Sequence, residues 1–440
     1  MRLPGLRQHW PRILFAAAVL WHIFMMSSLW TGHMDPLFHD SDTAPQAIDF
    51  YAIYQAGDWL IDGRSIYVVD FFFLDVPIAP PPFRYMPFVA YALAVPLNAL
   101  PPETAYWVWE ALVECMLLGC AWLTFRVGRD HAPWNWASAS LWLVPTPLYT
   151  EMYLGQFSIL MATLLLLTLI LLLRGRAWAS AVPWTVSLMV KANTALLAPL
   201  LLRMGHWRVI AAALVAVAIL NVPYVLINPG EFEHFWRHNF SEYFGERSRS
   251  DAFSTADLGF MQLVRTMWLW WVPDATHAPS WLLFGIGAAV LGASLAATFR
   301  PRDIDVTLLA PMWISVYFLV YTDVWSHHYV MLLPALVLLI IYQPEFRLMA
   351  LIVFVAVALP TPYFLFDRFL NSIPGERVFG VAIENYWPRW AGLAHHATKP
   401  VPVLWLWGSL VYYLIVTPSP SAAAEPDAER ALATGPAIEA

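Results

Sequence analysis

The sequence predicts an all-α polytopic membrane protein. Hydrophobic residues make up 60% of its 440 residues and charged residues only 12%, which is far more apolar than the core of a soluble domain requires. Several apolar runs approach the roughly 20 residues that cross a bilayer as a helix. Runs of this length predict membrane helices and not the short alternating strands of a barrel. The clearest runs cover residues 13–30, 105–125, 207–227, 280–299 and 348–366.

The distribution of charge predicts how these helices are oriented. Residues 32–83 contain eight aspartates and a single arginine, Arg64, whereas short turns with arginine pairs, such as 126–129 and 174–176, occur elsewhere. Short loops rich in Lys and Arg stay in the cytoplasm. We therefore expect the N-terminus to lie inside and residues 31–102 to form the first outer loop.

The first apolar run, 13–30, raises the alternatives of a cleaved signal peptide and a retained helix, because three arginines precede it. The run is long for a signal core, and no small-residue cleavage site follows it. We expect a retained first helix.

The whole pattern predicts one transmembrane domain over residues 1–416, with about twelve spans and both termini inside. Residues 85–100 are assigned to an interfacial helix, because this apolar stretch is short and contains Pro87 and Pro96. The short pieces on either side of Lys191 predict a hairpin or one broken helix. Residues 417–440, rich in Ala, Pro and Glu, predict a disordered cytoplasmic tail. The spans are expected at approximately 13–30, 103–125, 134–150, 157–173, 177–190, 192–202, 208–227, 280–299, 304–321, 328–343, 347–365 and 401–416.

A candidate general base follows the first span. Asp49 opens an amphipathic stretch where a carboxylate would face the boundary between water and membrane, and it could take a proton from a sugar hydroxyl. An aspartate that caps a helix or lies in its first turn is an equally good interpretation of the spacing alone. Asp40 and Asp42 are further acidic candidates, and no spacing matches a defined metal loop. We expect no cofactor, and a divalent cation bound with the help of Asp40 and Asp42 is the alternative that the sequence leaves open.

Candidate phosphate-binding groups lie at Lys191 and at the pair His327 and His328. A lysine in apolar surroundings is costly unless it faces a cavity or a partner, so Lys191 either binds a phosphate as a point charge or snorkels. The histidines can donate hydrogen bonds to a phosphate or sugar, or form an interfacial pair beside Trp325. Adjacent residues of a helix point about 100° apart, so the two histidines are not expected to share one role.

Other patterns narrow the function. The net charge of −7 excludes a strongly basic nucleic-acid-binding protein, and the chain has no Walker loop, GxGxxG fingerprint or zinc-protease motif. An activated lipid donor fits this absence. A secondary transporter is one alternative, although no internal repeat is evident. A flippase or sugar-lipid-binding protein without catalysis is another.

Several short motifs occur in a fixed order. They are Asp49-Phe50-x-x-x-Tyr54-x-Ala56-Gly57, Gly63-Arg64-Ser65-Ile66-Tyr67, Pro81-Pro82-Phe83-Arg84-Tyr85-Met86-Pro87, Gly155-Gln156-Phe157-Ser158, Lys191 with Pro199, and Trp325-Ser326-His327-His328-Tyr329 with Leu332-Leu333-Pro334. Together they resemble glycosyltransferase family 87, the polyprenol-phosphate-mannose-dependent mannosyltransferases with the GT-C membrane fold. The resemblance extends to about residue 345 and implies interfacial helices in the first outer loop.

The resemblance implies an inverting hexosyltransferase. It makes Asp49 and His327 catalytic, with Asp49 as the base that deprotonates the acceptor. It assigns the donor phosphate to Lys191, Arg84 and His328, and contacts with the sugar or acceptor to Tyr51, Gln156 and Trp325.

The resemblance also implies the partners and the location. The donor is a polyprenyl-phosphate-linked sugar, with mannose expected first, and the acceptor is a glycolipid or glycan. The membrane is expected to be a bacterial inner membrane with the active site facing outside. Because Phe157 stands where the family often has Asn, and Tyr321-Thr322-Asp323 where it often has a Ser-Pro pair, another hexose or a pentose stays open. Relatives of protein mannosyltransferases or of lipid A aminoarabinose transferases are the alternative within this enzyme class.

Overall fold

The computed structural model describes residues 6–33, 46–68, 73–236, 257–272, 275, 277–301, 303–360 and 389–417. Within these ranges the secondary structure is helical, apart from an isolated β-bridge between Asp257 and Trp325. The predicted all-α class is therefore confirmed. Asp35, Asp40, Asp42 and Asp70, and the predicted tail from residue 418 onward, lie outside the described residues.

Four helices are long and apolar enough to cross a membrane: α1 (Leu6–Trp30), α6 (Pro102–Val127), α12 (Trp207–Ile227) and α17 (Ser280–Phe299). A fifth span results if α22 (Arg389–Ala397) and α23 (Pro400–Val416), which meet at a 50° bend, are counted as one. Further apolar helices of 10–17 residues are α9 (Ser158–Leu173), α10 (Ala177–Val190), α18 (Val306–Val320), α19 (Leu333–Tyr342) and α20 (Arg347–Ala358). The chain is thus a membrane protein, and the count of about twelve spans stays a prediction.

The remaining helices are short. They are α3 (Ile48–Ile61), α4 (Pro87–Val89), η1 (Ala90–Ala94), α5 (Val95–Leu97), η2 (Arg129–His131), α7 (Trp134–Ser140), α8 (Thr146–Leu154), η3 (Ala192–Leu197), α11 (Ala198–Arg203), α13 (Pro229–Trp236), α16 (Phe260–Trp271) and η5 (Ser326–Leu332). The break between α10 and η3 falls at Lys191. Trp184 Nε1 donates to the carbonyl oxygen of Thr194 at 2.9 Å, and the hydroxyls of Ser187 and Thr194 lie 2.8 Å apart, so the chain folds back after Lys191. Of the two forms predicted for this segment, the structure has the hairpin.

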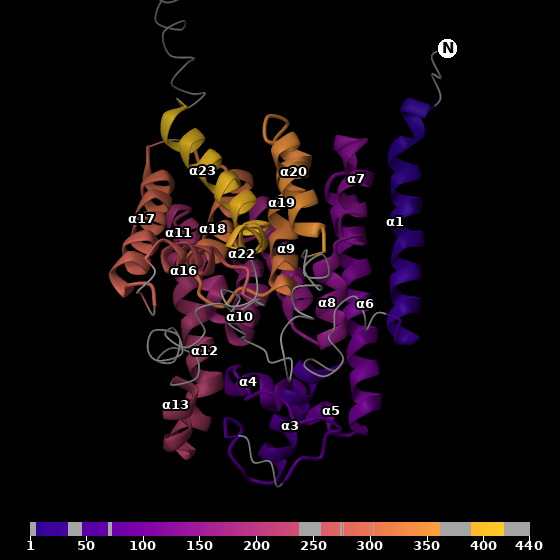
Figure 1. The fold of residues 1–440 in the computed structure, drawn as a ribbon, viewed down its shortest axis with the longest axis vertical. Coiled ribbons are helices and arrows are strands. Elements are labelled where there is room, and N and C mark those ends of the chain that lie inside the picture. The colour runs from indigo at the N-terminus through magenta and orange to yellow at the C-terminus, as the bar shows by residue number, and fades with distance from the viewer. Residues whose placement is uncertain are drawn as a thin grey trace, which may run out of the picture.

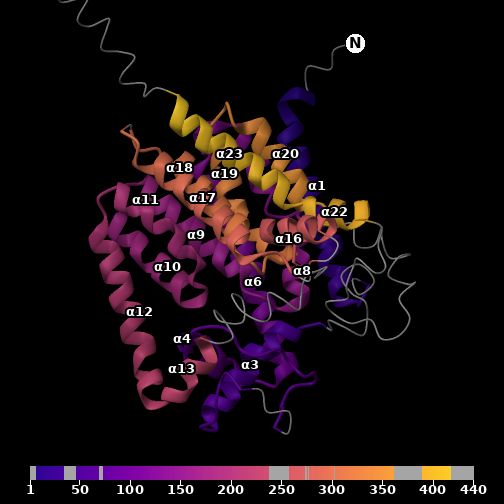
Figure 2. The same cartoon turned by 60° about the vertical axis from the view of Figure 1, so that its left-hand side comes forward.

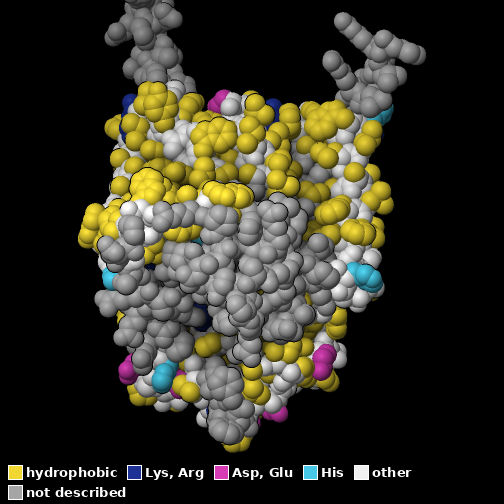
Figure 3. Space-filling view, viewed as in Figure 1, with side chains coloured by type: hydrophobic (Ala, Val, Ile, Leu, Met, Phe, Trp, Pro, Cys, Tyr) yellow, Lys and Arg dark blue, Asp and Glu magenta, His cyan; other side chains and the backbone are white. Residues whose placement is uncertain are grey.

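The helix bundle has two distinct ends (Figures 1 and 2). Helix α1 begins and α23 ends at the upper end, whereas α3, α4, α5 and α13 gather at the lower end. On the face drawn in Figure 3, hydrophobic side chains cover the upper part and acidic side chains lie mostly near the lower end. This arrangement agrees with an acidic first loop on the side opposite to the start of α1 and the end of α23.

The first loop forms a small helical layer at the lower end of the bundle. Residues 87–97 form one continuous helical stretch, which packs along α3. Gly57 of α3 makes this approach close, because a β-carbon there would lie 2.7 Å from the backbone carbon of Ala94. Eleven residues cannot cross a bilayer, which agrees with the interfacial helix expected at 85–100.

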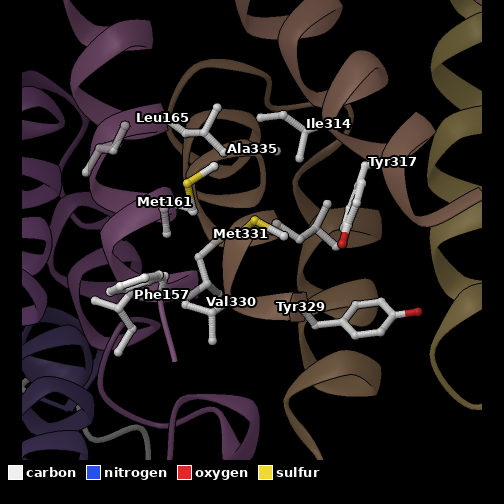
Figure 4. Close-up of a cluster of buried hydrophobic side chains, with 14 of the residues drawn as sticks. Phe157, Met161, Leu165, Ile314, Tyr317, Tyr329, Val330, Met331 and Ala335 are labelled. Atoms are coloured by element: carbon white, nitrogen blue, oxygen red, sulfur yellow. The ribbon is translucent and has the colours of Figure 1, made fainter. Parts of the chain in front are cut away.

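The centre of the bundle holds η5 in place. Helices α18 and α19 are buried on all sides, as expected of helices that are apolar all round. Figure 4 shows Met331 and Val330 of η5 packed among Phe157, Met161 and Ile314 from neighbouring segments. The short 3-10 helix η5, which carries the histidine pair, therefore has a rigid apolar support.

Candidate active site

Asp49 lies in the first turn of α3, next to a fixed point of the backbone. The helix is capped by Ala47, which adopts a left-handed conformation with φ 67°. The N–H of Ala47 donates to the carbonyl oxygen of Tyr153, 2.8 Å away, and so ties the start of α3 to the end of α8. Asp49 is therefore an acid of the first turn and not the N-cap, so its carboxylate is not consumed by capping.

The turn between α8 and α9 brings Gln156 to Asp49. Gly155 ends α8 with φ +72°, and a β-carbon there would lie only 2.5 Å from the β-carbon of Phe50. Glycine is thus required both for the left-handed turn and for the close approach to α3. The side chain of Gln156 lies close enough to Asp49 to lower its pKa, and the hydroxyl of Tyr85 donates to Gln156 Oε1 at 3.0 Å.

The positive charges of Lys191 and Arg84 act on Asp49. Burial raises the pKa of Asp49, while the hydrogen bond from Gln156 and the charges of Lys191 and Arg84 act in the opposite direction. Lys191 Nζ lies 6.0 Å from the centre of the Tyr85 ring, within the range of a cation–π contact. A carboxylate and two cations, predicted separately from the sequence, therefore belong to one site.

The two histidines of η5 have different surroundings, as their angular separation predicted. His328 Nε2 lies 3.1 Å from Lys191 Nζ, and its Nδ1 accepts a hydrogen bond from the backbone N–H of Trp325 at 3.1 Å. His327 is only 2% exposed, and neither of its ring nitrogens has a hydrogen-bond partner among the described residues. His328 is thus held by hydrogen bonds within the protein, whereas both ring nitrogens of His327 lack such a bond within the described part of the chain.

Arg84 and Trp325 meet at a residue to which the sequence analysis assigned no role. Arg84 Nη1 lies 3.4 Å from Asp323 Oδ2, and the indole N–H of Trp325 donates to Asp323 Oδ1 at 2.6 Å. The rings of Trp325 and His327 are 6.1 Å apart between centres. Asp323 lay within a motif quoted from the sequence, but nothing in the spacing connected it with Arg84.

Two further acids near the site were missed. Asp257 Oδ1 accepts the N–H groups of Gly259 and Val324, at 2.9 and 3.1 Å, and burial raises the pKa of Asp257 to about 7. Glu151 accepts the N–H of Ile159 at 3.0 Å and is one of the acids whose charge acts on Lys191. No sequence pattern identified Asp257, whereas Glu151 stood just before the Gly-Gln turn.

Most of the predicted site residues interact with another residue of the site, and Tyr51 is the exception. Arg84 and Trp325 are joined through Asp323, and Lys191 is joined to His328 and to the ring of Tyr85. Tyr51 is buried two positions beyond Asp49 on α3, about 200° around the helix, and the charge that acts on it is that of Glu103. In the described part of the chain, no group of three or more His, Cys, Asp or Glu could hold a metal ion. A reaction without a metal stays a prediction.

Comparisons with known proteins give one family. The model of glycosyltransferase family 87 matches residues 83–322, a range that includes Arg84, Gln156 and Lys191 but neither Asp49 nor the histidine pair. The chain is also similar to the structure of ArnT from Cupriavidus metallidurans bound to undecaprenyl phosphate, with a TM-score of 0.46 and 16% identity. That likeness covers 98% of this chain and 82% of the other. No curated protein matches the chain.

Proposed function

Because the chain belongs to glycosyltransferase family 87, whose model matches more than half of its 440 residues, we propose that it transfers mannose or another hexose from a polyprenyl-phosphate donor. The GT-C membrane fold implied by the motifs follows from the same membership, and the chain is an integral membrane glycosyltransferase. The proposed acceptor is a glycolipid or polysaccharide. The proposed location is a bacterial inner membrane, with the reaction on its outer face.

One observation carries the proposal. Asp49 from the first loop, Lys191 from the break after α10 and His328 from η5 belong to one connected site, although they are far apart in the chain. Transfer from a lipid phosphate needs a base at the acceptor and positive charge or hydrogen-bond donors at the leaving phosphate. This site supplies both. A secondary transporter gains no support from the family, and a non-catalytic sugar-lipid-binding protein is tested below.

The proposed reaction is a single inverting displacement. Asp49 takes the proton from the acceptor hydroxyl, and the acceptor oxygen forms a bond to the anomeric carbon of the sugar. The bond between that carbon and the phosphate oxygen breaks, and its electron pair leaves with the polyprenyl phosphate. The configuration at the anomeric carbon inverts, and Asp49 then releases its proton to water.

The other residues stabilise the leaving group and orient the sugar. Lys191 and Arg84 offset the charge that develops on the phosphate. His328 completes the phosphate site, and His327, whose ring nitrogens have no hydrogen-bond partner among the described residues, donates a hydrogen bond to a phosphate oxygen. Trp325, held through its indole N–H by Asp323, presents an apolar face to the sugar.

The test is sugar transfer by the purified full-length protein. The protein in detergent is incubated with radiolabelled polyprenyl-phosphate-mannose and a membrane lipid extract, and wild type is compared with Asp49→Asn. The matched control is Asp62→Asn, because Asp62 follows the same helix but is exposed and forms an ion pair with Arg64, at 3.6 Å.

We expect wild type and Asp62→Asn to transfer label and Asp49→Asn to lose at least about a hundredfold in rate, as for a missing general base. Equal transfer by Asp49→Asn would remove Asp49 as the base. If wild type transfers sugar neither from the mannosyl donor nor from glucosyl and arabinosyl donors, the protein acts as a binding protein and the catalytic proposal is wrong.

A further inference from the structure

We propose that Tyr85 and Gln156 are positioning residues that orient the Asp49 carboxylate through a chain of two hydrogen bonds. This inference rests on the proposed function, in which Asp49 is the base. It gives Gln156 a role different from the contact with sugar or acceptor that the motif resemblance implied. It gives Tyr85 a role for the first time.

The proposal depends on which end of the Gln156 side-chain amide faces Tyr85 and which end faces Asp49. The Tyr85 hydroxyl donates to Gln156 Oε1 at 3.0 Å, so this oxygen is an acceptor and the NH₂ group points away from Tyr85. The remaining NH₂ group is the only part of this amide that can donate to the neighbouring Asp49 carboxylate, and Gln156 lowers the pKa of Asp49. The opposite orientation of the amide would place Oε1 against a carboxylate oxygen. Tyr85 therefore selects the orientation in which Gln156 supports the ionised base.

Tyr85 is itself held rigidly. Its ring packs edge-on against Phe157 with centres 4.8 Å apart, and against Phe83 at 5.5 Å. Its backbone carbonyl accepts the hydroxyl of Tyr67 at 3.0 Å. The side chain is 92% buried, because only 8% of the residue is exposed. Such a fixed ring holds its hydroxyl oxygen in one place, where the O–H group can donate to the Gln156 amide.

Gln156 is fixed from the other side by the backbone. The preceding Gly155 touches Phe50, the residue next to Asp49, so the turn and the first turn of α3 move together. We infer that the amide donates to one carboxylate oxygen of Asp49 and leaves the second for the acceptor hydroxyl. A carboxylate held in this way avoids the loss of rate that a misplaced base causes.

Tyr85 also links the two halves of the reaction. Its hydroxyl faces the base through Gln156, while its ring lies 6.0 Å from Lys191 Nζ, on the side of the leaving phosphate. A single rigid ring therefore sets the spacing between the group that receives the proton and the group that receives the phosphate charge.

The experiment compares Gln156→Ala, Gln156→Glu and Tyr85→Phe with wild type in full-length protein, and measures kcat, KM for the donor and the pH dependence of kcat. Tyr91→Phe is the control, because it removes the same hydroxyl from a partly exposed tyrosine of the same loop. Tyr85→Phe keeps the ring packing, so it tests the chain even if the Gln156 variants fold poorly.

We expect Tyr85→Phe to lower kcat about tenfold, and Gln156→Ala somewhat more, with KM for the donor within about twofold of wild type. The hydrogen bond from Gln156 favours ionised Asp49, so its loss shifts the acid limb of the kcat profile to higher pH. Gln156→Glu, which adds a like charge, should shift that limb furthest. Tyr91→Phe should match wild type.

Two results would overturn this inference and leave the proposed function intact. One is an active wild type with an unchanged acid limb in both Gln156→Ala and Tyr85→Phe. The other is a raised KM with unchanged kcat in Gln156→Ala, which assigns Gln156 to substrate binding. The proposed function fails separately, through an inactive wild type or a fully active Asp49→Asn.

Discussion

Lys191 Nζ and His328 Nε2 lie 3.1 Å apart, although the residues are 137 positions apart in the chain. The backbone N–H of Trp325 donates to His328 Nδ1, so a neutral His328 carries its proton on Nε2. That proton and the ammonium group of Lys191 then face each other as two donors. An anion that accepts from both resolves this conflict, and a phosphate oxygen is such an anion.

Lys191→Met should therefore weaken the donor complex. We expect KM for the polyprenyl-phosphate sugar to rise about tenfold or more, and product inhibition by polyprenyl phosphate to weaken in parallel, because a charge-assisted contact is lost. Steady-state kinetics with varied donor and added polyprenyl phosphate measures both effects. An unchanged donor KM in Lys191→Met would exclude Lys191 from the phosphate site.

The other lysine of the chain provides the control for Lys191. Lys399 Nζ is buried and donates to the carbonyl oxygens of Val357 and Leu359, at 2.7 and 3.0 Å. Lys399→Met should lower the midpoint of thermal unfolding but leave the donor KM as in wild type. A raised KM in both variants would indicate a general loss of structure.

Gly155→Ala should destabilise the protein and slow transfer. A left-handed conformation costs a residue with a β-carbon roughly 1–2 kcal/mol, and the 2.5 Å contact with Phe50 adds an overpacking cost of about 1–3 kcal/mol. The matched control is Gly175→Ala, because Gly175 has φ +67° and no atom within 4 Å of its β-carbon position. The midpoint of thermal unfolding should fall clearly further for Gly155→Ala than for Gly175→Ala. Equal decreases would show that the contact between Gly155 and Phe50 of α3 does not limit the space at this turn.

The sequence predicted those parts of the fold that the bilayer dictates. Apolar runs of span length had to be helices because lipid offers no hydrogen-bond partner to a free backbone. The short interfacial helix at 87–97 was recognisable for the same reason, since its length and prolines prevent a crossing. The hairpin at Lys191 was one of two forms that the sequence left open, because both satisfy the backbone.

The site was only partly predictable. Lys191 and Asp49 could be identified because a charge beside apolar segments is costly and needs a reason. The contacts of Asp323 and Tyr85 depend on segments far away in the chain, and periodicity does not encode them. The direction of the Gln156 amide depends on a single hydroxyl, so the sequence placed Gln156 in the site without showing that it faces Asp49.

Asp323→Asn should extend activity to lower pH. The negative charge of Asp323 raises the pKa of Asp49, and Arg84 lowers it. Removing the charge of Asp323 and freeing Arg84 from its ion pair both favour ionised Asp49, so the acid limb of kcat should shift to lower pH. Asn can still accept from the Trp325 indole. Asp130→Asn, at an exposed carboxyl, is the control, and a shift to higher pH in Asp323→Asn would contradict this account.

Asp257 should make the stability of the protein depend on pH. Its pKa is raised to about 7 by burial, against an ordinary value near about 4 in an unfolded chain. The folded state therefore holds the proton more tightly. The stability that this proton contributes is complete below about pH 4 and is lost as the pH rises to about 7. Thermal unfolding of wild type should show a lower midpoint at pH 7.5 than at pH 5, and Asp257→Asn should reduce that difference.

Two substitutions of Asp257 separate the effect of its charge from the effect of its hydrogen bonds. Asp257→Asn keeps an oxygen that can accept from Gly259 and Val324, whereas Asp257→Ala leaves both N–H groups without this acceptor. Unsatisfied buried donors cost about 1–3 kcal/mol each. We therefore expect Asp257→Ala to unfold at a lower temperature than wild type at every pH, and Asp257→Asn to match or exceed wild type at pH 7.5. An Asp257→Asn protein that keeps the full pH dependence of wild type would show that other groups cause it.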